Sequence, residues 1–180
     1  KVHQLVSDAV CRQLISDVPI CTMLSGGLDS SILTAIAAKQ LSYADKTLAT
    51  YSVAYEGNNE HFQTNAFQTT QDEFWIEKMQ KRYGTKHTQI ELQQHSLVDA
   101  LTEAMRFKDM PSMADIDSSL YLFCKEIKKT HSVALSGECA DEVFGGYPWF
   151  YAQKQTAFPW LRATSEREGL LSERWQRKLR

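Results

Sequence analysis

The chain has 180 residues, of which 43% are hydrophobic, and its formal net charge is −2 at pH 7. This length and hydrophobic content predict one globular domain with a substantial core. No apolar run approaches the roughly 20 residues needed to span a bilayer, and the N-terminal segment lacks the apolar stretch of a signal peptide, so nothing in the sequence argues for a membrane and we expect no membrane partner.

Helices and strands alternate along the predicted chain. Apolar residues at helical spacing predict a first helix over 2–16, and β-branched, apolar runs predict the strands. Thr70 and Glu73 have the spacing of a capping box at a helix start. In chain order the predicted elements are helix 2–16, strand 20–24, helix 32–41, strand 47–53, loop 54–69, helix 70–83, strand 86–92, helix 96–104, helix 118–129 and strand 131–135. This order predicts an α/β fold with a Rossmann-like parallel sheet covered by helices on both faces.

Cysteine and charge patterns narrow the functional classes. The cysteines, Cys11, Cys21, Cys124 and Cys139, are too scattered for a disulfide framework and indicate a reducing cytoplasm. The histidines show no zinc-ligand spacing. Residues 152–180 carry seven Lys or Arg against three Asp or Glu. Because these charges are dispersed and lack a recognisable motif, we expect a solvated surface there, or an edge that faces a missing lobe, and no nucleic-acid partner.

The segment 24–31, Leu-Ser-Gly-Gly-Leu-Asp-Ser-Ser, joins a predicted strand to a predicted helix. Consecutive glycines let a ligand approach the backbone, and the first amides of the helix are unpaired donors at the positive end of its dipole, which predicts a phosphate site. Within such a loop the carboxylate of Asp29 would repel phosphate unless a metal stands between them, so Asp29 indicates Mg²⁺. The alternative is that Asp29 only caps the helix.

A second glycine-containing segment, 133–147 (Val-Ala-Leu-Ser-Gly-Glu-Cys-Ala-Asp-Glu-Val-Phe-Gly-Gly-Tyr), also follows a predicted strand. Both segments therefore emerge at the carboxyl edge of the sheet, where open α/β folds bind ligands, and both can face one nucleotide. Within it, Glu138, Asp141 and Glu142 have the spacing of one helical face. The alternative for Asp141 and Glu142 is that they only favour the helix dipole.

These segments carry a family resemblance. Ser-Gly-Gly-x-Asp-Ser at 25–30 resembles the pyrophosphate loop of the ATP pyrophosphatases. The segment 133–147 resembles the second nucleotide segment of the glutamine-hydrolysing asparagine synthetases, and 12–19 resembles the lead-in of that family. The similarity runs along most of residues 2–151.

The resemblance implies the roles of particular residues. It implies ATP and Mg²⁺ as ligands, with Mg²⁺ handled by Asp29 and Asp141. Glu138 and Asp141 are implied to be catalytic, with Glu138 taking a proton from ammonia. The residues implied to bind the nucleotide are Leu24, Ser25, Gly26, Gly27, Leu28, Asp29, Ser30, Val53, Ser136 and Gly137.

The resemblance also implies a reaction. The family is a class of ATP-dependent amide ligases that adenylate the β-carboxylate of aspartate, release pyrophosphate and then use ammonia from glutamine to form asparagine and AMP. Two alternatives stay open: a related amidotransferase or β-lactam synthetase-like enzyme acting on another carboxylate, and a non-catalytic ATP-binding fragment. The homodimer is one candidate oligomeric state.

Two departures from the family pattern are visible. Residues 113–119 lack the arginine common where the family lines its aspartate site, so Asp115 and Asp117 are interpreted as helix caps, as marks of a sub-branch or as signs of another acceptor. Cys139 stands where the family usually has Gly or Ser, and we expect it to be a small buried residue.

The resemblance predicts a domain organisation. Residues 1–151 are expected to form the ATP-pyrophosphatase synthetase domain, and 152–180 the start of a truncated C-terminal helical extension. The N-terminal glutaminase domain is expected to be absent from this segment, because its nucleophile would be an N-terminal cysteine and the chain begins with Lys1. The isolated segment is therefore expected to bind nucleotide but to turn over little.

Overall fold

The computed structural model of the chain describes residues 1–57, 72–110 and 113–147. The chain divides into two compact units, Lys1–Gly137 and Glu138–Arg180. Within the described ranges, no helix combines the length and the apolar character needed to cross a membrane. The domain boundary predicted at residue 151 lies outside the described residues and stays a prediction.

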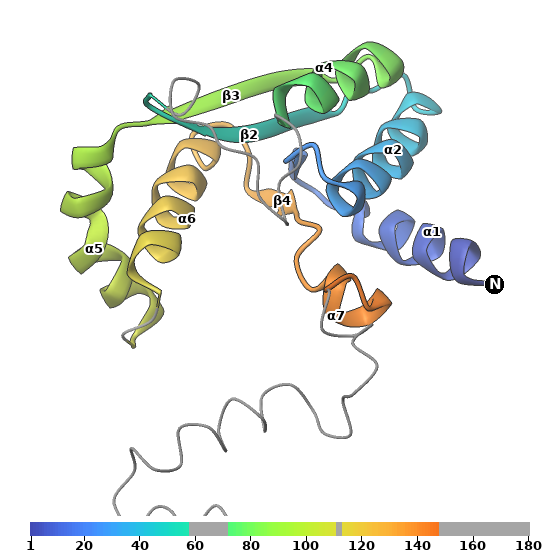
Figure 1. Ribbon diagram of the computed structural model, residues 1–180. Coiled ribbons are helices and arrows are strands. Elements are labelled where there is room, and N and C mark those ends of the chain that lie inside the picture. Colours follow the sequence, from blue (N-terminus) through green and yellow to red (C-terminus); the bar gives the residue numbers. More distant parts are fainter. Residues whose placement is uncertain (58–71, 111–112, 148–180) are drawn as a thin grey trace, which may run out of the picture. The chain divides into compact units, whose positions relative to one another are not determined.

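The first unit contains the sheet and the longer helices (Figure 1). Its helices are α1 (Val2–Gln13), α2 (Leu28–Ser42), α4 (Asp72–Tyr83), α5 (Gln94–Lys108) and α6 (Ala114–Ile127). Its strands are β1 (Ile20–Met23), β2 (Ala49–Tyr55), β3 (Lys86–Leu92) and β4 (Val133–Leu135). The second unit begins with the short helix α7 (Ala140–Phe144).

The strands form a parallel sheet in the order β3-β2-β1-β4. The chain moves from β1 to β2 to β3 in one direction and then returns to add β4 on the other side of β1. The direction of winding therefore reverses between β1 and β4, which are in register from Ile20 with Val133 onward. The predicted α/β class is confirmed, and the loops that follow β1 and β4 leave the sheet at the crevice where such folds bind ligands.

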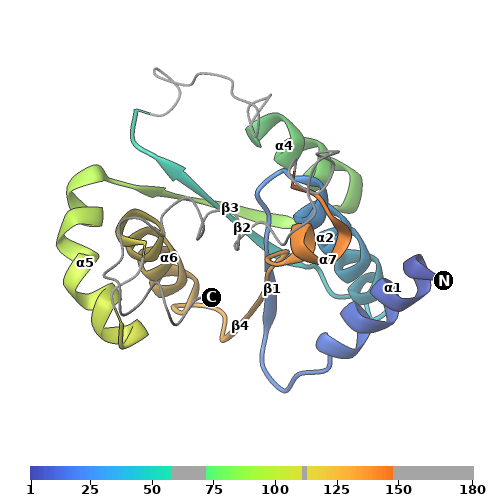
Figure 2. The same cartoon turned by 60° about the horizontal axis from the view of Figure 1, so that its bottom comes forward.

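One face of the sheet is apolar. Cys21 and Tyr51 on the strands are buried with Phe123 and Ile127 of α6, and α5 packs on α6 (Figure 2). Burial raises the pKa of the Cys21 thiol to about 11, so this thiol stays protonated. All four cysteines of the chain are free. This packed face fixes α6 against the middle of the sheet.

The opposite face, which α2 and α4 cover, buries polar side chains. Thr22 and Thr34, both fully buried, share a hydrogen bond of 2.9 Å between their hydroxyls. Apolar packing on this side gathers where α1 and α2 meet the start of β2, at Val10, Ala37, Ala38 and Leu48. Helices therefore cover both faces, as predicted.

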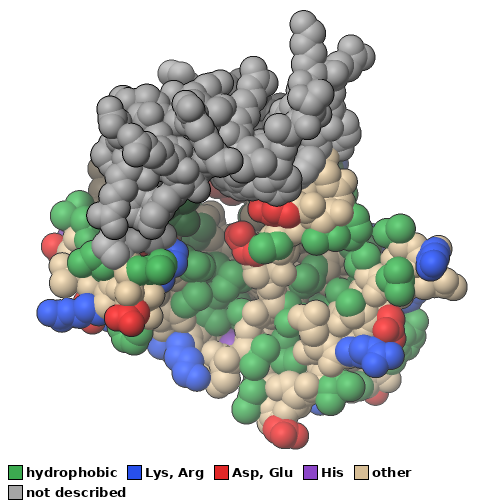
Figure 3. All heavy atoms as spheres, turned by 90° about the horizontal axis from the view of Figure 1, so that it is seen from below, with side chains coloured by type: hydrophobic (Ala, Val, Ile, Leu, Met, Phe, Trp, Pro, Cys, Tyr) green, Lys and Arg blue, Asp and Glu red, His purple; other side chains and the backbone are tan. Residues whose placement is uncertain are grey.

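Hydrophobic side chains also remain on the surface. Val98 and Met105 of α5 and Leu120 of α6 are exposed. Hydrophobic side chains likewise occupy much of the middle of the face drawn in Figure 3, where Lys and Arg lie toward the margins.

Several element boundaries differ from the predictions, and α6 gives the clearest reason. Ser118, predicted to begin that helix, lies inside it. Its hydroxyl donates to the Ala114 carbonyl one turn earlier, at 2.7 Å, and does not cap the helix start. Helix α2 begins at Leu28 instead of Ile32, and α5 begins at Gln94 instead of Ser96, without a side-chain cap. Thr70 of the predicted capping box, and most of the predicted loop 54–69, lie outside the described residues.

Candidate functional site

The loop after β1 is held together by serine hydroxyls. The Leu24 amide donates to the Tyr51 carbonyl at 2.7 Å, which ties the start of the loop to β2. Ser30, only 7% exposed, lies within hydrogen-bond distance of the Ser25 hydroxyl at 3.0 Å and donates to the Gly27 carbonyl at 3.2 Å. The Ser25 amide also donates to the Ser30 hydroxyl, at 3.2 Å. The loop is therefore closed by contacts between its own residues.

The two glycines of this loop differ in backbone conformation and in position relative to α2. Gly26 has φ of +82°, and a Cβ there would lie 2.7 Å from the Asp72 carbonyl oxygen, so the loop passes against the start of α4 in a way that requires glycine. Gly27 has φ of −69° and occupies the N-cap of α2 without a side-chain cap. The amides of the first turn of α2, where Leu28 and Asp29 lie, therefore face the loop without a capping side chain, as an anion site needs.

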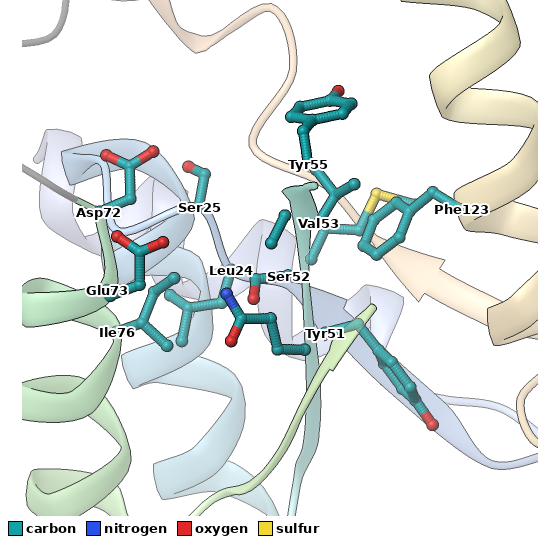
Figure 4. A pocket seen from close by; sticks show the side chains of 13 residues that line it. Leu24, Ser25, Tyr51, Ser52, Val53, Tyr55, Asp72, Glu73, Ile76 and Phe123 are labelled. Atoms are coloured by element: carbon teal, nitrogen blue, oxygen red, sulfur yellow. The ribbon is translucent and has the colours of Figure 1, made fainter. Parts of the chain in front are cut away.

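Beside the loop is a cavity of about 230 Å³ (Figure 4). Leu24 and Ser25 of the loop and Val53 of β2 line it together, so these predicted nucleotide residues share one space. β2 extends two residues past Val53, to Tyr55, which also lines the cavity. Because ligand pockets for drug-sized molecules are about 300–1,000 Å³, this volume suits part of such a ligand and not the whole of it.

The loop after β4 reaches the first turn of α2. A Cβ at Gly137 would lie 3.0 Å from the Ser30 amide nitrogen and 3.2 Å from Asp29. Gly137 belongs to the first unit, so this approach of the second glycine segment to the first is part of one compact body. The predicted nucleotide residues of the two segments are therefore brought together here, with Ser136 directly before Gly137.

The carboxylates of the second segment lie in the second unit. α7 begins at Ala140, so Asp141 and Glu142 are helical, whereas Glu138 lies in the turn before the helix. The prediction that all three share one helical face is therefore wrong for Glu138. The Tyr147 hydroxyl donates to Glu142 at 3.4 Å, and partial burial, followed by the nearby carboxylates, raises the pKa of Tyr147.

Cys139 is the N-cap of α7 and has φ of +67°. Its side chain is exposed, so the prediction that it fills a buried space is wrong. A left-handed conformation is costly for a residue with a Cβ and free for glycine, which explains physically why a small residue suits this position. The difference from the family pattern at position 139 therefore concerns the backbone conformation that the residue must adopt.

Metal ligation at Asp29 and Asp141 stays a prediction. Among the described residues, no group of three or more His, Cys, Asp or Glu is arranged to hold a metal ion. Mg²⁺ is commonly bound by one or two carboxylates completed by substrate phosphates, so a dedicated protein cage is not required for the predicted role.

The first turns of α6 differ from the predicted caps. Met113 is the N-cap and makes no side-chain cap, and Asp117 lies inside the helix in an ion pair of 2.7 Å with Lys108. Ser119 hydrogen-bonds the hydroxyl of Tyr55, at 2.5 Å. Because Tyr55 lines the cavity, this contact joins α6 to the candidate site.

Sequence reasoning missed part of the cavity lining. Asp72, Glu73 and Ile76 come from α4, Gln89 from β3 and Phe123 from α6. Ser52 precedes the predicted Val53, and its side chain points to the opposite face of β2. No spacing along the chain marks these residues, because they meet only when α4 and β3 pack beside β2.

Several known proteins are similar to this chain in sequence. The family model described as asparagine synthase matches residues 1–180. The chain is 57% identical over 180 residues to asparagine synthetase [glutamine-hydrolyzing] 3 of Bacillus subtilis, covering 99% of this chain and 29% of that protein. It is 30% identical over 164 residues to asparagine synthetase B of Escherichia coli, covering 84% of this chain and 27% of that protein.

A solved structure is similar in fold. The glutamine-dependent NAD⁺ synthetase of Acinetobacter baumannii, determined in complex with ADP, matches 96% of this chain and 33% of its own chain, with a TM-score of 0.51 and 17% identity. At this identity the likeness concerns the fold alone.

The chain spans less than a third of the length of its Bacillus and Escherichia relatives.

Proposed function

Because the chain belongs to the asparagine synthase family, we propose that it is the ATP-binding part of an ATP-dependent amide ligase that makes asparagine. The β-carboxylate of aspartate attacks the α-phosphorus of ATP, the bond to the bridging oxygen breaks, and pyrophosphate leaves. Ammonia from glutamine then attacks the acyl carbon, and AMP leaves. The glutamine-hydrolysing part belongs to the rest of the longer protein.

The observation that carries this proposal is the approach of Gly137 to the first turn of α2. It supports a single nucleotide bound by both segments, with the loop amides on the phosphates and the cavity at Val53 on the adenosine. Amides fixed before the reaction can stabilise charge that develops on the departing pyrophosphate. Binding ATP and aspartate side by side would also raise the reaction rate, because it holds the carboxylate close to the α-phosphorus.

The proposed roles of the carboxylates follow from their chemistry. Asp29 and Asp141 would each offer Mg²⁺ the oxygen ligands that it prefers, and Asp29 fits because it lies in the first turn of α2 beside the loop. Bound Mg²⁺ would offset the negative charge of the phosphates. Glu138 accepts a proton from the nitrogen of ammonia as the new carbon–nitrogen bond forms.

The test is exchange of labelled pyrophosphate into ATP, catalysed by the longest encoded form of the protein with Mg²⁺. We expect exchange that requires aspartate and is lost in Asp29→Ala. Asp8→Ala is the control, because Asp8 is an exposed residue of α1 paired with Arg12. Exchange that depends on another carboxylate would replace aspartate as the acceptor, and ATP binding without any exchange would favour a non-catalytic role.

We also propose a cellular location and an oligomeric state. The free cysteines agree with a reducing cytoplasm as the site of action. The homodimer stays a prediction, and sedimentation of the full-length protein would test it.

A further inference from the structure

In the described part of the chain, one edge of β2 has no neighbouring strand beyond Tyr51. β1 pairs with β2 only as far as Met23 with Tyr51, whereas β3 pairs with β2 to its last residue, Tyr55 with Leu92. The cavity beside the loop is lined by this end of β2, at Val53 and Tyr55 (Figure 4). A ligand in the cavity would therefore contact side chains from the last residues of the strand.

Tyr55 continues an apolar row along β2. Because side chains alternate along a strand, Tyr51, Val53 and Tyr55 point to the same face of the sheet. Tyr51 and Val53 pack there with Phe123 of α6. Tyr55 lies at the end of the row and is 38% exposed, whereas Tyr51 is 7% exposed. Packing alone therefore holds the ring of Tyr55 less firmly than that of Tyr51.

A hydroxyl group of α6 holds the far end of the Tyr55 ring. The hydroxyls of Tyr55 and Ser119 share a hydrogen bond of 2.5 Å, and Ser119 is 8% exposed. Ser119 and Phe123 are one turn apart on α6, so they share a face of that helix. Helix α6 thus contacts the cavity directly through Phe123 and indirectly through Tyr55.

This hydrogen bond restricts the conformation of a partly exposed ring. A tyrosine side chain can adopt several staggered rotamers, and a ring at the surface has space for more than one of them. A bond from its hydroxyl to a buried partner on a packed helix favours the rotamer in which Tyr55 lines the cavity. A side chain that is already ordered loses less entropy when a ligand binds, which increases the affinity.

We propose that Ser119 is a positioning residue for nucleotide binding, because it holds the ring of Tyr55 against the adenosine of ATP. This inference rests on the proposed binding of ATP in the cavity. It also gives a role to the segment 113–119, which departs from the family pattern. The last residue of that segment acts on the nucleotide through Tyr55, and not on the acceptor carboxylate.

The experiment measures the affinity of the longest encoded form for MgATP, in the parent protein and in variants of the pair. Tyr55→Phe and Ser119→Ala each remove one partner of the hydrogen bond, so each should weaken ATP binding about fivefold. The double variant should bind no more weakly than either single variant, because both changes remove the same bond. Tyr55→Ala should weaken binding roughly twentyfold, because the ring no longer covers the ligand.

Tyr83→Phe and Ser118→Ala are the matched controls. Tyr83 is also 38% exposed, but it lies at the end of α4 and does not line the cavity. Ser118 precedes Ser119 on α6, is fully buried and donates its hydrogen bond to the helix backbone. Both controls should keep the parent affinity for ATP. Ser118→Ala should lower the stability measured by urea unfolding, which separates damage to α6 from the loss of positioning.

Three results would overturn the inference. These are an unchanged affinity for ATP in Ser119→Ala, additive losses in the double variant, and a loss in Ser118→Ala equal to that in Ser119→Ala. A rise in the KM for aspartate alone, measured by pyrophosphate exchange, would also overturn it by assigning Tyr55 to the acceptor. In each case ATP binding by the parent protein would still support the proposed function. If the parent protein bound no ATP, both would fall.

Discussion

The two glycine segments are built in different ways. In the first, Ser25 and Ser30 close the loop with their hydroxyls, and the loop and the helix that follows it belong to one compact unit. In the second, the first unit ends at Gly137, Glu138 lies in the turn that follows, and Asp141 and Glu142 lie on a short helix bounded by the positive φ angles of Cys139 and Gly145. The comparison teaches that the proposed phosphate loop is closed by contacts between its own residues, whereas the proposed catalytic carboxylates belong to a separate unit.

The largest expected effect breaks the first segment. Gly26→Ala should lower the free energy of unfolding by about 3 kcal/mol and abolish ATP binding, because it combines a left-handed conformation with a Cβ that would lie 2.7 Å from a backbone oxygen of α4. Gly27→Ala is the control for stability, since its Cβ would meet only the Ser25 hydroxyl at 3.4 Å. Urea unfolding measures the stability of both variants, and nucleotide titration measures ATP binding by Gly26→Ala. Equal losses of stability in the two variants would contradict a special requirement for glycine at position 26.

A smaller effect is expected where the segments meet. Gly137→Ala should weaken ATP binding about tenfold, because its Cβ would crowd the first turn of α2, with the Ser30 amide at 3.0 Å. Gly84→Ala provides the contrast. Gly84 has φ of +62°, and an added Cβ would have no neighbouring atom within 4 Å, so the cost of about 1 kcal/mol should appear in stability and not in affinity. If Gly137→Ala lowered stability alone, the meeting of the segments would have no role in binding.

The second segment should become more stable when its strain is removed. Cys139→Gly should raise the free energy of unfolding of the structure around α7 by about 1 kcal/mol, because glycine adopts a φ of +67° without steric cost. Cys139→Ala keeps a Cβ and should leave stability nearly unchanged. Denaturant unfolding distinguishes the two. A similar gain in both variants would instead implicate the thiol.

The smallest expected effect is a difference in pH dependence between the two units. Burial lowers the pKa of His87 in the first unit, so the unfolded chain binds more protons, and stability should fall as the pH drops below about 6.5. In the second unit the pKa of Tyr147 is raised, so the folded state favours the protonated phenol. The contribution of Tyr147 to stability should therefore be lost as the pH rises above about 10. Thermal unfolding of His87→Asn and Tyr147→Phe against pH measures each. An acid-side slope that persists in His87→Asn would assign it to other groups.

The sequence predicted the fold well because local patterns and tertiary structure agree in most elements. The strand Lys86–Leu92 was predicted with its observed bounds, since β-branched and apolar residues alternate there between a glycine and a polar segment. The start of α6 was missed because Ser118 hydrogen-bonds backward inside the helix, although serine more often marks a helix start. Propensity alone does not distinguish the two positions.

The candidate site could be predicted only where residues are contiguous. The phosphate loop and Val53 were predicted from glycine spacing and family resemblance, and the structure brings Leu24, Ser25 and Val53 to one cavity. Glu73 was interpreted as a capping residue, yet its side chain lines that cavity. Glu73 reaches the cavity only because α4 packs beside β2. The exposed position of Cys139 likewise depends on a backbone angle that no residue pattern reveals.

The pairing of β1 with β4 has a consequence for how the protein folds. Cys21 and Val133, which share a hydrogen bond across that pair, are 112 residues apart in the chain. Contacts of such high sequence separation form slowly, because the entropy of closing a long loop is lost before the contacts can stabilise the chain. Gly137 can reach α2 only once β4 has docked, so during synthesis the nucleotide site is completed after nearly all of the first unit has left the ribosome. Nucleotide binding would then report that the last strand of the sheet is in place.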